Sequence, residues 1–224
     1  MARRACLWIG GGLFCVALAW CAWWYLFVIG RTDRAGGGAA VIADAALFTA
    51  FALHHSVFAR AGAKQWLARL PPQLIRSIYV YAASVLLILV CVLWRPIGGG
   101  LYRASGTPAM AFGAIQLGGV WLIARAAARI DPLELAGIHE PRAGAPLVTS
   151  GPYGWVRHPV YLGWVLVVFG TPRMTGDRLA FAALSTAYLI LATPLEERSL
   201  VRAFGDDYVR YRRRVRWRII PFIY

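Results

Sequence analysis

Two groups of polar side chains in the C-terminal half of the chain have types and spacing suited to holding a small polar ligand. Residues 151–163, Gly-Pro-Tyr-Gly-Trp-Val-Arg-His-Pro-Val-Tyr-Leu-Gly, form a charged and aromatic loop directly before an apolar region. Two adjacent carboxylates follow at Glu196 and Glu197. Carboxylates accept hydrogen bonds from hydroxyl or amino groups, and aromatic faces such as Tyr153 and Tyr161 can hold a cation. The two groups predict a ligand pocket if the fold brings them together.

A simpler structural role is open for each group. The loop can form a collar at the membrane surface, and the carboxylates can pair with Arg198 and Arg202. Neighbouring residues on a helix point about 100° apart, so only one of the two glutamates needs to face a ligand. Pro159 suits the first turn of a helix, where backbone N–H groups near His158 would face the occupant of the pocket.

The composition places these groups in a membrane protein. Hydrophobic residues make up 59% of the 224 residues and charged residues 15%. About 20 consecutive apolar residues let a helix cross a bilayer. Four segments meet this requirement, at residues 5–30, 39–58, 74–94 and 110–128. A fifth apolar region, 160–193, is interrupted at 171–178 by Pro, Gly and charged residues, which predicts a helical hairpin with one shortened arm.

We therefore expect an all-α integral membrane protein with about five to six transmembrane helices, including a C-terminal helical hairpin, and a cytoplasmic C-terminal helix. The first apolar segment is expected to stay as a membrane helix rather than a cleaved signal, because it is long and carries Trp20, Trp23 and Trp24 as an interfacial belt. The four cysteines lack the paired spacing of a zinc site, so we expect packing roles for them and no metal.

The basic residues indicate where the chain lies. The formal net charge of +14, from 24 Lys and Arg residues, is compatible with nucleic-acid binding, but their distribution favours a membrane. With both termini in the cytoplasm, most basic residues fall on the inner side. The outer loops hold Arg31, Arg34, Arg95, Arg103, Arg173 and Arg178. We expect a bacterial inner-membrane protein whose basic tail, residues 211–218, lies against anionic lipid headgroups, with no nucleic acid and no obligate protein partner.

The two polar groups together resemble the signature of a known family. Residues 157–161, Arg-His-Pro-Val-Tyr, followed after residues 162–195 by Glu196-Glu197 and then by residues 204–211, are similar to isoprenylcysteine carboxyl methyltransferases and phospholipid methyltransferases. The resemblance implies an S-adenosylmethionine pocket open to the membrane. It assigns cofactor binding to Tyr153, Arg157, His158, Pro159, Tyr161, Glu196, Glu197, Tyr208 and Tyr211. We expect four N-terminal transmembrane helices at 1–130, and an S-adenosylmethionine-binding connector, helical hairpin and C-terminal helix at 131–224.

A narrower resemblance extends further towards the N-terminus. Residues 55–60, 73–79 and 94–99 are similar to bacterial methanethiol S-methyltransferases and to membrane proteins of the NnrU type. The connector at residues 131–140 matches the thiol methyltransferases only in part. The acceptor that this resemblance implies is a thiol of the methanethiol kind, and the carboxyl group of an isoprenylcysteine or a phospholipid remains as an alternative.

Methyl transfer from a sulfonium is an in-line displacement that depends on positioning. A thiol acceptor must lose a proton, which makes His55 a candidate general base, whereas Arg60 would suit an acceptor that carries a carboxylate. The same residues can instead form a polar helix end. Two alternatives of another kind are a haem-binding protein of the NnrU type, with His54 or His55 as axial ligand, and a membrane scaffold without a cofactor.

Overall fold

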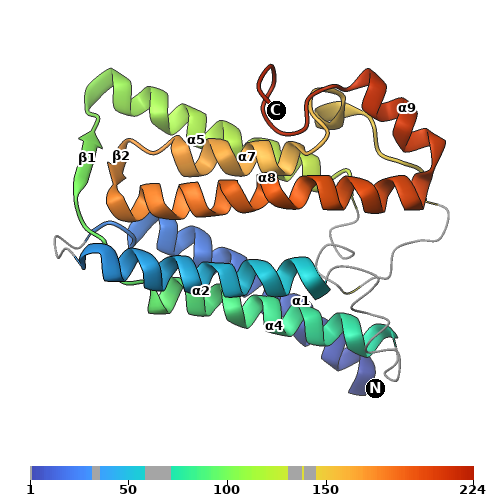
Figure 1. The fold of residues 1–224 in the computed structure, drawn as a ribbon, viewed down its shortest axis with the longest axis horizontal. Helices are drawn as coiled ribbons and strands as arrows, with labels where there is room; N and C mark the ends of the chain where they lie inside the picture. Colours follow the sequence, from blue (N-terminus) through green and yellow to red (C-terminus); the bar gives the residue numbers. More distant parts are fainter. Residues whose placement is uncertain (1, 32–35, 59–71, 131–137, 139–144) are drawn as a thin grey trace. The chain divides into compact units, whose positions relative to one another are not determined.

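The computed structural model describes residues 2–31, 36–58, 72–130, 138 and 145–224 (Figure 1). The described elements fall into two compact units. The first unit contains α1 (Ala2–Phe27), α2 (Gly37–Phe58) and α4 (Pro72–Leu93). The second contains β1 (Gly100–Arg103), α5 (Gly106–Ala127), η1 (Gly151–Gly154), α7 (Pro159–Phe169), β2 (Arg173–Thr175), α8 (Gly176–Phe204) and α9 (Asp206–Arg214).

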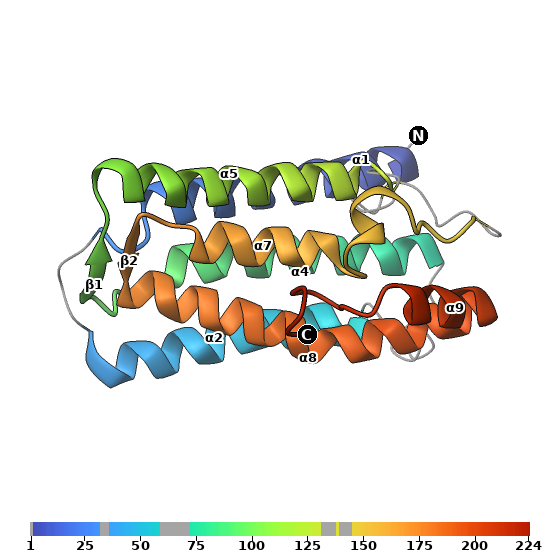
Figure 2. The ribbon, with the colours of Figure 1, turned by 90° about the horizontal axis from the view of Figure 1, so that it is seen from above.

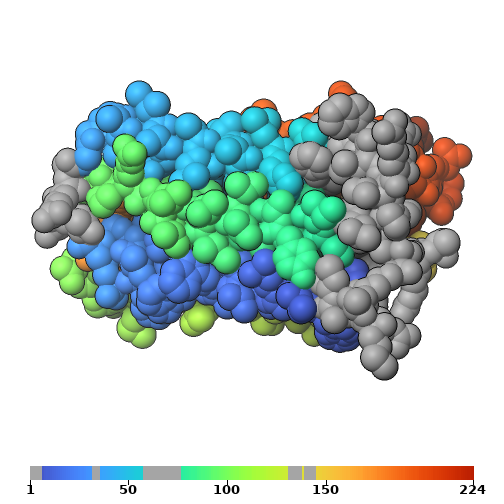
Figure 3. All heavy atoms as spheres, turned by 90° about the horizontal axis from the view of Figure 1, so that it is seen from below, coloured from blue at the N-terminus to red at the C-terminus, as the bar shows by residue number. Residues whose placement is uncertain are grey.

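In the first unit, α4 packs between α1 and α2, and the three helices lie side by side in Figure 3. Each corresponds to a predicted apolar segment, because a helix satisfies every backbone polar group of a chain that lipid surrounds. Two hydrogen bonds from backbone N–H groups join α2 and the residue before it to the chain that follows α4. The Gly36 N–H donates to the Pro96 carbonyl and the Arg95 N–H donates to the Asp44 carboxylate, each at 2.9 Å.

In the second unit, α7 lies between α5 and α8 (Figure 2). Side-chain hydrogen bonds link the three helices, as expected where lipid surrounds them. The Gln116 amide donates to the Val167 carbonyl at 2.9 Å, and the Trp164 indole donates to the Ser185 hydroxyl at 3.0 Å. Because α5 packs so extensively on α7, it belongs with the C-terminal elements in space. The predicted boundary at residue 130 concerned which residues bind a cofactor, and it stays a prediction.

The predicted all-α membrane architecture is confirmed. In the described part of the chain, four helices are long and apolar enough to cross a membrane: Leu7–Phe27, Gly37–Val57, Gly106–Ala127 and Gly176–Phe204. The predicted hairpin is α7 and α8, and its shortened arm is α7. The 11 residues of α7 rise about 16 Å, roughly half of a hydrocarbon core that is about 30 Å thick.

A small antiparallel sheet lies at the end of the short arm, where sequence analysis predicted only a turn. Tyr102 in β1 is opposite Met174 in β2, and Arg103 is opposite Arg173. Next to the sheet, the Ala104 N–H donates to the Pro172 carbonyl at 2.8 Å. The sheet thus satisfies backbone groups of the extended chain that continues the arm beyond α7.

Two glycines allow α5 and α7 to approach closely. A Cβ atom on Gly119 would lie 2.6 Å from the Gly163 carbonyl oxygen, and one on Gly163 would lie 2.7 Å from the Gly119 carbonyl oxygen. Both distances are shorter than real Cβ contacts, and the neighbouring atoms are backbone atoms that cannot turn aside. Small residues serve this purpose at helix contacts in membranes.

We predict that Gly119→Ala destabilises the protein by about 1–3 kcal/mol, because the added methyl group must push α5 away from α7. Gly118→Ala is the matched control, since a Cβ there meets nothing within 4 Å and alanine favours a helix by up to about 1 kcal/mol. Thermal unfolding in detergent measures both. Equal midpoints for the two variants would contradict the close contact.

Candidate functional site

The loop before α7 is held in place by the backbone of the C-terminal segment. The Arg157 N–H donates to the Trp217 carbonyl at 2.9 Å, and the His158 N–H donates to the Arg218 carbonyl at 2.8 Å. His158 is the N-cap residue of α7 and Pro159 its first residue, where proline costs no hydrogen bond because the first N–H groups of a helix have no partner within it. The loop before α7 and the C-terminal segment, which are far apart in sequence, thus meet at one junction.

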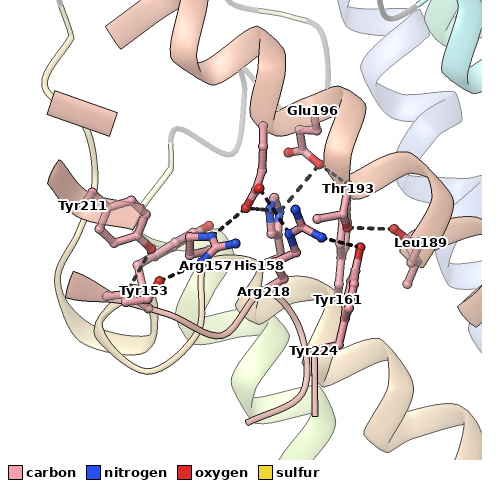
Figure 4. Close-up of polar contacts among 12 residues, drawn as sticks. Tyr153, Arg157, His158, Tyr161, Leu189, Thr193, Glu196, Tyr211, Arg218 and Tyr224 are labelled. Atoms are coloured by element: carbon pink, nitrogen blue, oxygen red, sulfur yellow. Dashed lines mark hydrogen bonds and ion pairs between the residues drawn. The ribbon is translucent and has the colours of Figure 1, made fainter. Parts of the chain in front are cut away.

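Arg157 connects this junction to α8 (Figure 4). Its Nε donates to Glu197 Oε1 at 2.5 Å, and its Nη1 donates to the Val215 and Arg216 carbonyls at 2.8 and 2.7 Å. The side chains of Arg157 and Glu197 are only 5% and 4% exposed. A buried ion pair of this kind is tolerated only when further hydrogen bonds satisfy both groups.

Arg218 supplies the second cation for Glu197. Its Nε lies 3.3 Å from Glu197 Oε2, and its Nη1 donates to the Tyr224 hydroxyl at 3.0 Å (Figure 4). The Tyr224 hydroxyl in turn donates to the Ile190 carbonyl at 3.3 Å. That carbonyl lies four residues before Pro194, which has no N–H to donate to it. The tyrosine therefore takes the place of a missing helical hydrogen bond.

Glu196 and Tyr161 form the more exposed part of the cluster, and the His158 side chain, which is only 5% exposed, is buried beside them. The Tyr161 hydroxyl donates to Glu196 Oε2 at 2.7 Å, and the Glu196 side chain is 43% exposed. The rings of His158 and Tyr161 are stacked, with centroids 5.3 Å apart and planes inclined by 11°. The His158 ring lies between the carboxylates, with Nδ1 3.6 Å from Glu196 and Nε2 3.5 Å from Glu197. A carboxylate beside an aromatic face suits a cationic ligand that also has polar donors.

Tyr153, Tyr208 and Tyr211 form the support behind this surface. Tyr208 and Tyr211 are 1% and 5% exposed, and the Tyr211 hydroxyl donates to the Tyr153 carbonyl at 2.7 Å. Burial, together with the charge of Glu196, raises the pKa of Tyr153 to about 12. Burial also raises the pKa values of Tyr208 and Tyr211. All three hydroxyls stay neutral at physiological pH, so none of them can act as a general base there.

The structure brings together the predicted loop and the two glutamates. Arg157, His158 and Tyr161 contact Glu196 or Glu197 directly, whereas Pro159, Tyr208 and Tyr211 are buried behind them. The roles of all these residues in cofactor binding stay predictions.

The two residues proposed for the acceptor are placed differently. His55 lies in the first unit, where its Nδ1 hydrogen-bonds the Tyr79 hydroxyl. Arg60 lies outside the described residues.

The contribution of the C-terminal segment was not predicted from the sequence. Residues 215–218 contribute backbone carbonyls, which carry no signal in the residue types. Arg218 stands in a run of arginines that was assigned to lipid headgroups, and nothing in its spacing distinguishes it from its neighbours. No group of three His, Cys, Asp or Glu residues in the described part of the chain is arranged to hold a metal ion.

Comparison with known proteins shows the family to which the chain belongs. The family model of isoprenylcysteine carboxyl methyltransferase matches residues 136–202, which include the loop and both glutamates. Methanethiol S-methyltransferase 2 of Bradyrhizobium diazoefficiens is 39% identical over 189 residues, 80% of this chain and 72% of that protein. Methanethiol S-methyltransferase of Mycobacterium tuberculosis is 38% identical over 189 residues, 80% of this chain and 77% of that protein. The chain belongs to the isoprenylcysteine carboxyl methyltransferase-like superfamily.

Nurim of Bos taurus is a more distant relative of this membrane methyltransferase. The two are 30% identical over 176 residues, 70% of this chain and 66% of Nurim. No solved structure matches the chain.

We predict that Arg157→Gln destabilises the methyltransferase by about 3–5 kcal/mol, because it removes one partner of a buried ion pair. Hydrogen exchange of residues 215–218 should accelerate along with the loss of thermal stability, since two of their carbonyls lose the guanidinium. Arg213→Gln is the control, because Arg213 is exposed on α9 and such changes usually stay within about 0.5 kcal/mol. Unchanged exchange in Arg157→Gln would show that the ion pair does not hold this segment.

Proposed function

We propose that this membrane methyltransferase transfers the methyl group of S-adenosylmethionine to a small thiol such as methanethiol. The observation that carries the proposal is the half-exposed Glu196 carboxylate beside the stacked rings of His158 and Tyr161, next to the apolar hairpin α7 and α8. The names of the relatives, which are methanethiol S-methyltransferases at 38–39% identity, support the acceptor.

The described residues fit such a cofactor. Contacts to Glu196 within the described chain use Oε2, which leaves Oε1 for a ribose hydroxyl or an ammonium group. The partly exposed Tyr161 ring, stacked on the buried His158 ring, can present an aromatic face to a sulfonium. Arg157 and Glu197 position this surface from behind, with Pro159, Tyr153, Tyr208 and Tyr211 as the packed support. When bound, S-adenosylmethionine supplies an electrophilic methyl group on a positively charged sulfur.

The acceptor thiol has to reach the methyl carbon in line with the bond that breaks and must lose its proton. We propose that His55, whose Nδ1 hydrogen-bonds the Tyr79 hydroxyl, accepts this proton. Arg60 is the alternative residue for an acceptor that carries a carboxylate. A site that excludes water favours the reaction, because the sulfonium loses its charge during transfer.

We predict that Glu196→Gln and His158→Ala each weaken the binding of S-adenosylhomocysteine by about tenfold, since each removes a polar contact worth roughly 1–2 kcal/mol. Isothermal titration of the purified protein measures the affinity. Asp207→Asn is the matched control, because its exposed carboxylate pairs only with Arg210 on α9 among the described residues. Wild-type affinity in both site variants, or no heat in wild-type protein, would contradict the assignment.

A methylation assay with labelled S-adenosylmethionine tests the acceptor. We expect transfer to small thiols and little transfer to prenylcysteines or phospholipids. His55→Ala should lower kcat for the thiol while leaving the affinity for S-adenosylhomocysteine unchanged, because a general base acts on the acceptor. Preferred methylation of a prenylcysteine or a phospholipid would replace the thiol as substrate. A strong Soret band that disappears in His55→Ala would favour the haem-binding alternative.

A further inference from the structure

A pocket of about 440 Å³ lies in the angle between α8, α9 and the C-terminal segment. This size is within the range of sites for small molecules. Its polar lining consists of Glu197 and four arginines: Arg198, Arg202, Arg212 and Arg218. Its apolar lining is Pro194, Val201 and Val209.

The pocket is on a different face of α8 from the candidate cofactor surface. Pro194, Glu197 and Val201 follow one another at intervals of three and four residues, so they share one face of the helix. Glu196 points about 100° away from Glu197, and neither it nor His158 or Tyr161 lines the pocket. The two sites share Glu197, whose carboxylate already has Arg157 and Arg218 as partners.

The charge of the lining indicates an anion. The one carboxylate is occupied by its own ion pairs, and Arg202 makes a hydrogen bond with the Ser199 hydroxyl. Arg198 and Arg212 are exposed and have no acidic partner among the described residues. S-adenosylmethionine carries a net positive charge at neutral pH, so a lining with four guanidiniums does not suit it. A phosphate group suits it well, because guanidiniums bind phosphate oxygens through paired hydrogen bonds.

The position of the pocket indicates where the phosphate comes from. The first 20 or so residues of α8, which begins at Gly176, rise about 30 Å and fill the hydrocarbon core. The pocket begins at Pro194, so it lies at the level of lipid headgroups. The segment that supplies Arg218 also exposes Phe222 and Ile223, which are 84% and 77% exposed and suit the interface of a bilayer.

We propose that this pocket binds the phosphate of an anionic membrane lipid through Arg198, Arg202 and Arg212, and that the apolar lining contacts the glycerol and upper acyl chain. The bound headgroup neutralises the arginines at the junction of α8 and α9. This pocket includes Glu197 but not Glu196, His158 or Tyr161 of the proposed cofactor surface.

The test uses delipidated full-length protein in detergent and native mass spectrometry to count bound lipids. The probes are short-chain phosphatidylglycerol, phosphatidylcholine of the same chain length, and inorganic phosphate. Arg198→Gln combined with Arg212→Gln should lower phosphatidylglycerol affinity by about tenfold or more, because a hydrogen bond to a charged phosphate contributes roughly a tenfold factor in affinity. Arg210→Gln combined with Arg213→Gln removes the same charge from α9 outside the pocket, and affinity should change less than about twofold.

Titration of the same preparations with S-adenosylhomocysteine separates this proposal from the proposed function, because the pocket variant should keep wild-type affinity for it. If both double variants lost phosphatidylglycerol binding equally, the loss would come from general surface charge and not from the pocket, and the proposal would be overturned. Competition between S-adenosylhomocysteine and phosphatidylglycerol would assign the pocket to the cofactor and overturn it as well. Phosphate bound as tightly as phosphatidylglycerol would identify a free anion instead of a lipid.

Discussion

The ion pair between Arg157 and Glu197 is the constraint on which the rest of the site depends. Removing two charges from water costs several kcal/mol for each ion, and only good geometry with further hydrogen bonds offsets that cost. The compensation here comes from the Val215 and Arg216 carbonyls and from Arg218. The loop before α7, the end of α8 and the C-terminal segment must therefore meet. Their meeting also sets the rotation of α8, and with it the direction of Glu196.

The polar residues of the site differ in how deeply they are buried, and this difference separates structural roles from ligand contact. Tyr208 and Tyr211 are 1% and 5% exposed and pack in one cluster with apolar residues of α8, and Tyr211 also donates a hydrogen bond to η1. Glu196, one residue before the buried Glu197, is 43% exposed. The two adjacent glutamates thus differ strongly in solvent exposure. One is suited to stabilising the fold and the other to contacting a ligand.

Much of this arrangement could be predicted from the sequence. Long apolar runs have few alternatives to a helix in lipid, and the short arm follows from Pro and Gly at residues 171–176. The sheet could not be predicted, because strands of four and three residues are too short to show an alternating pattern. The junction of Arg157 with residues 215–218 could not be predicted either. Its acceptors are backbone carbonyls, which every residue possesses.

The junction also imposes an order on biosynthesis. The N–H groups of Arg157 and His158 find their partners at Trp217 and Arg218, about 60 residues later in the chain. While the ribosome is still making α8, these N–H groups and the Arg157 guanidinium can be satisfied only by water or lipid headgroups. The loop can therefore adopt its final conformation only after residue 218 has left the exit tunnel. The site is completed only when α8, α9 and the C-terminal segment have all been synthesised.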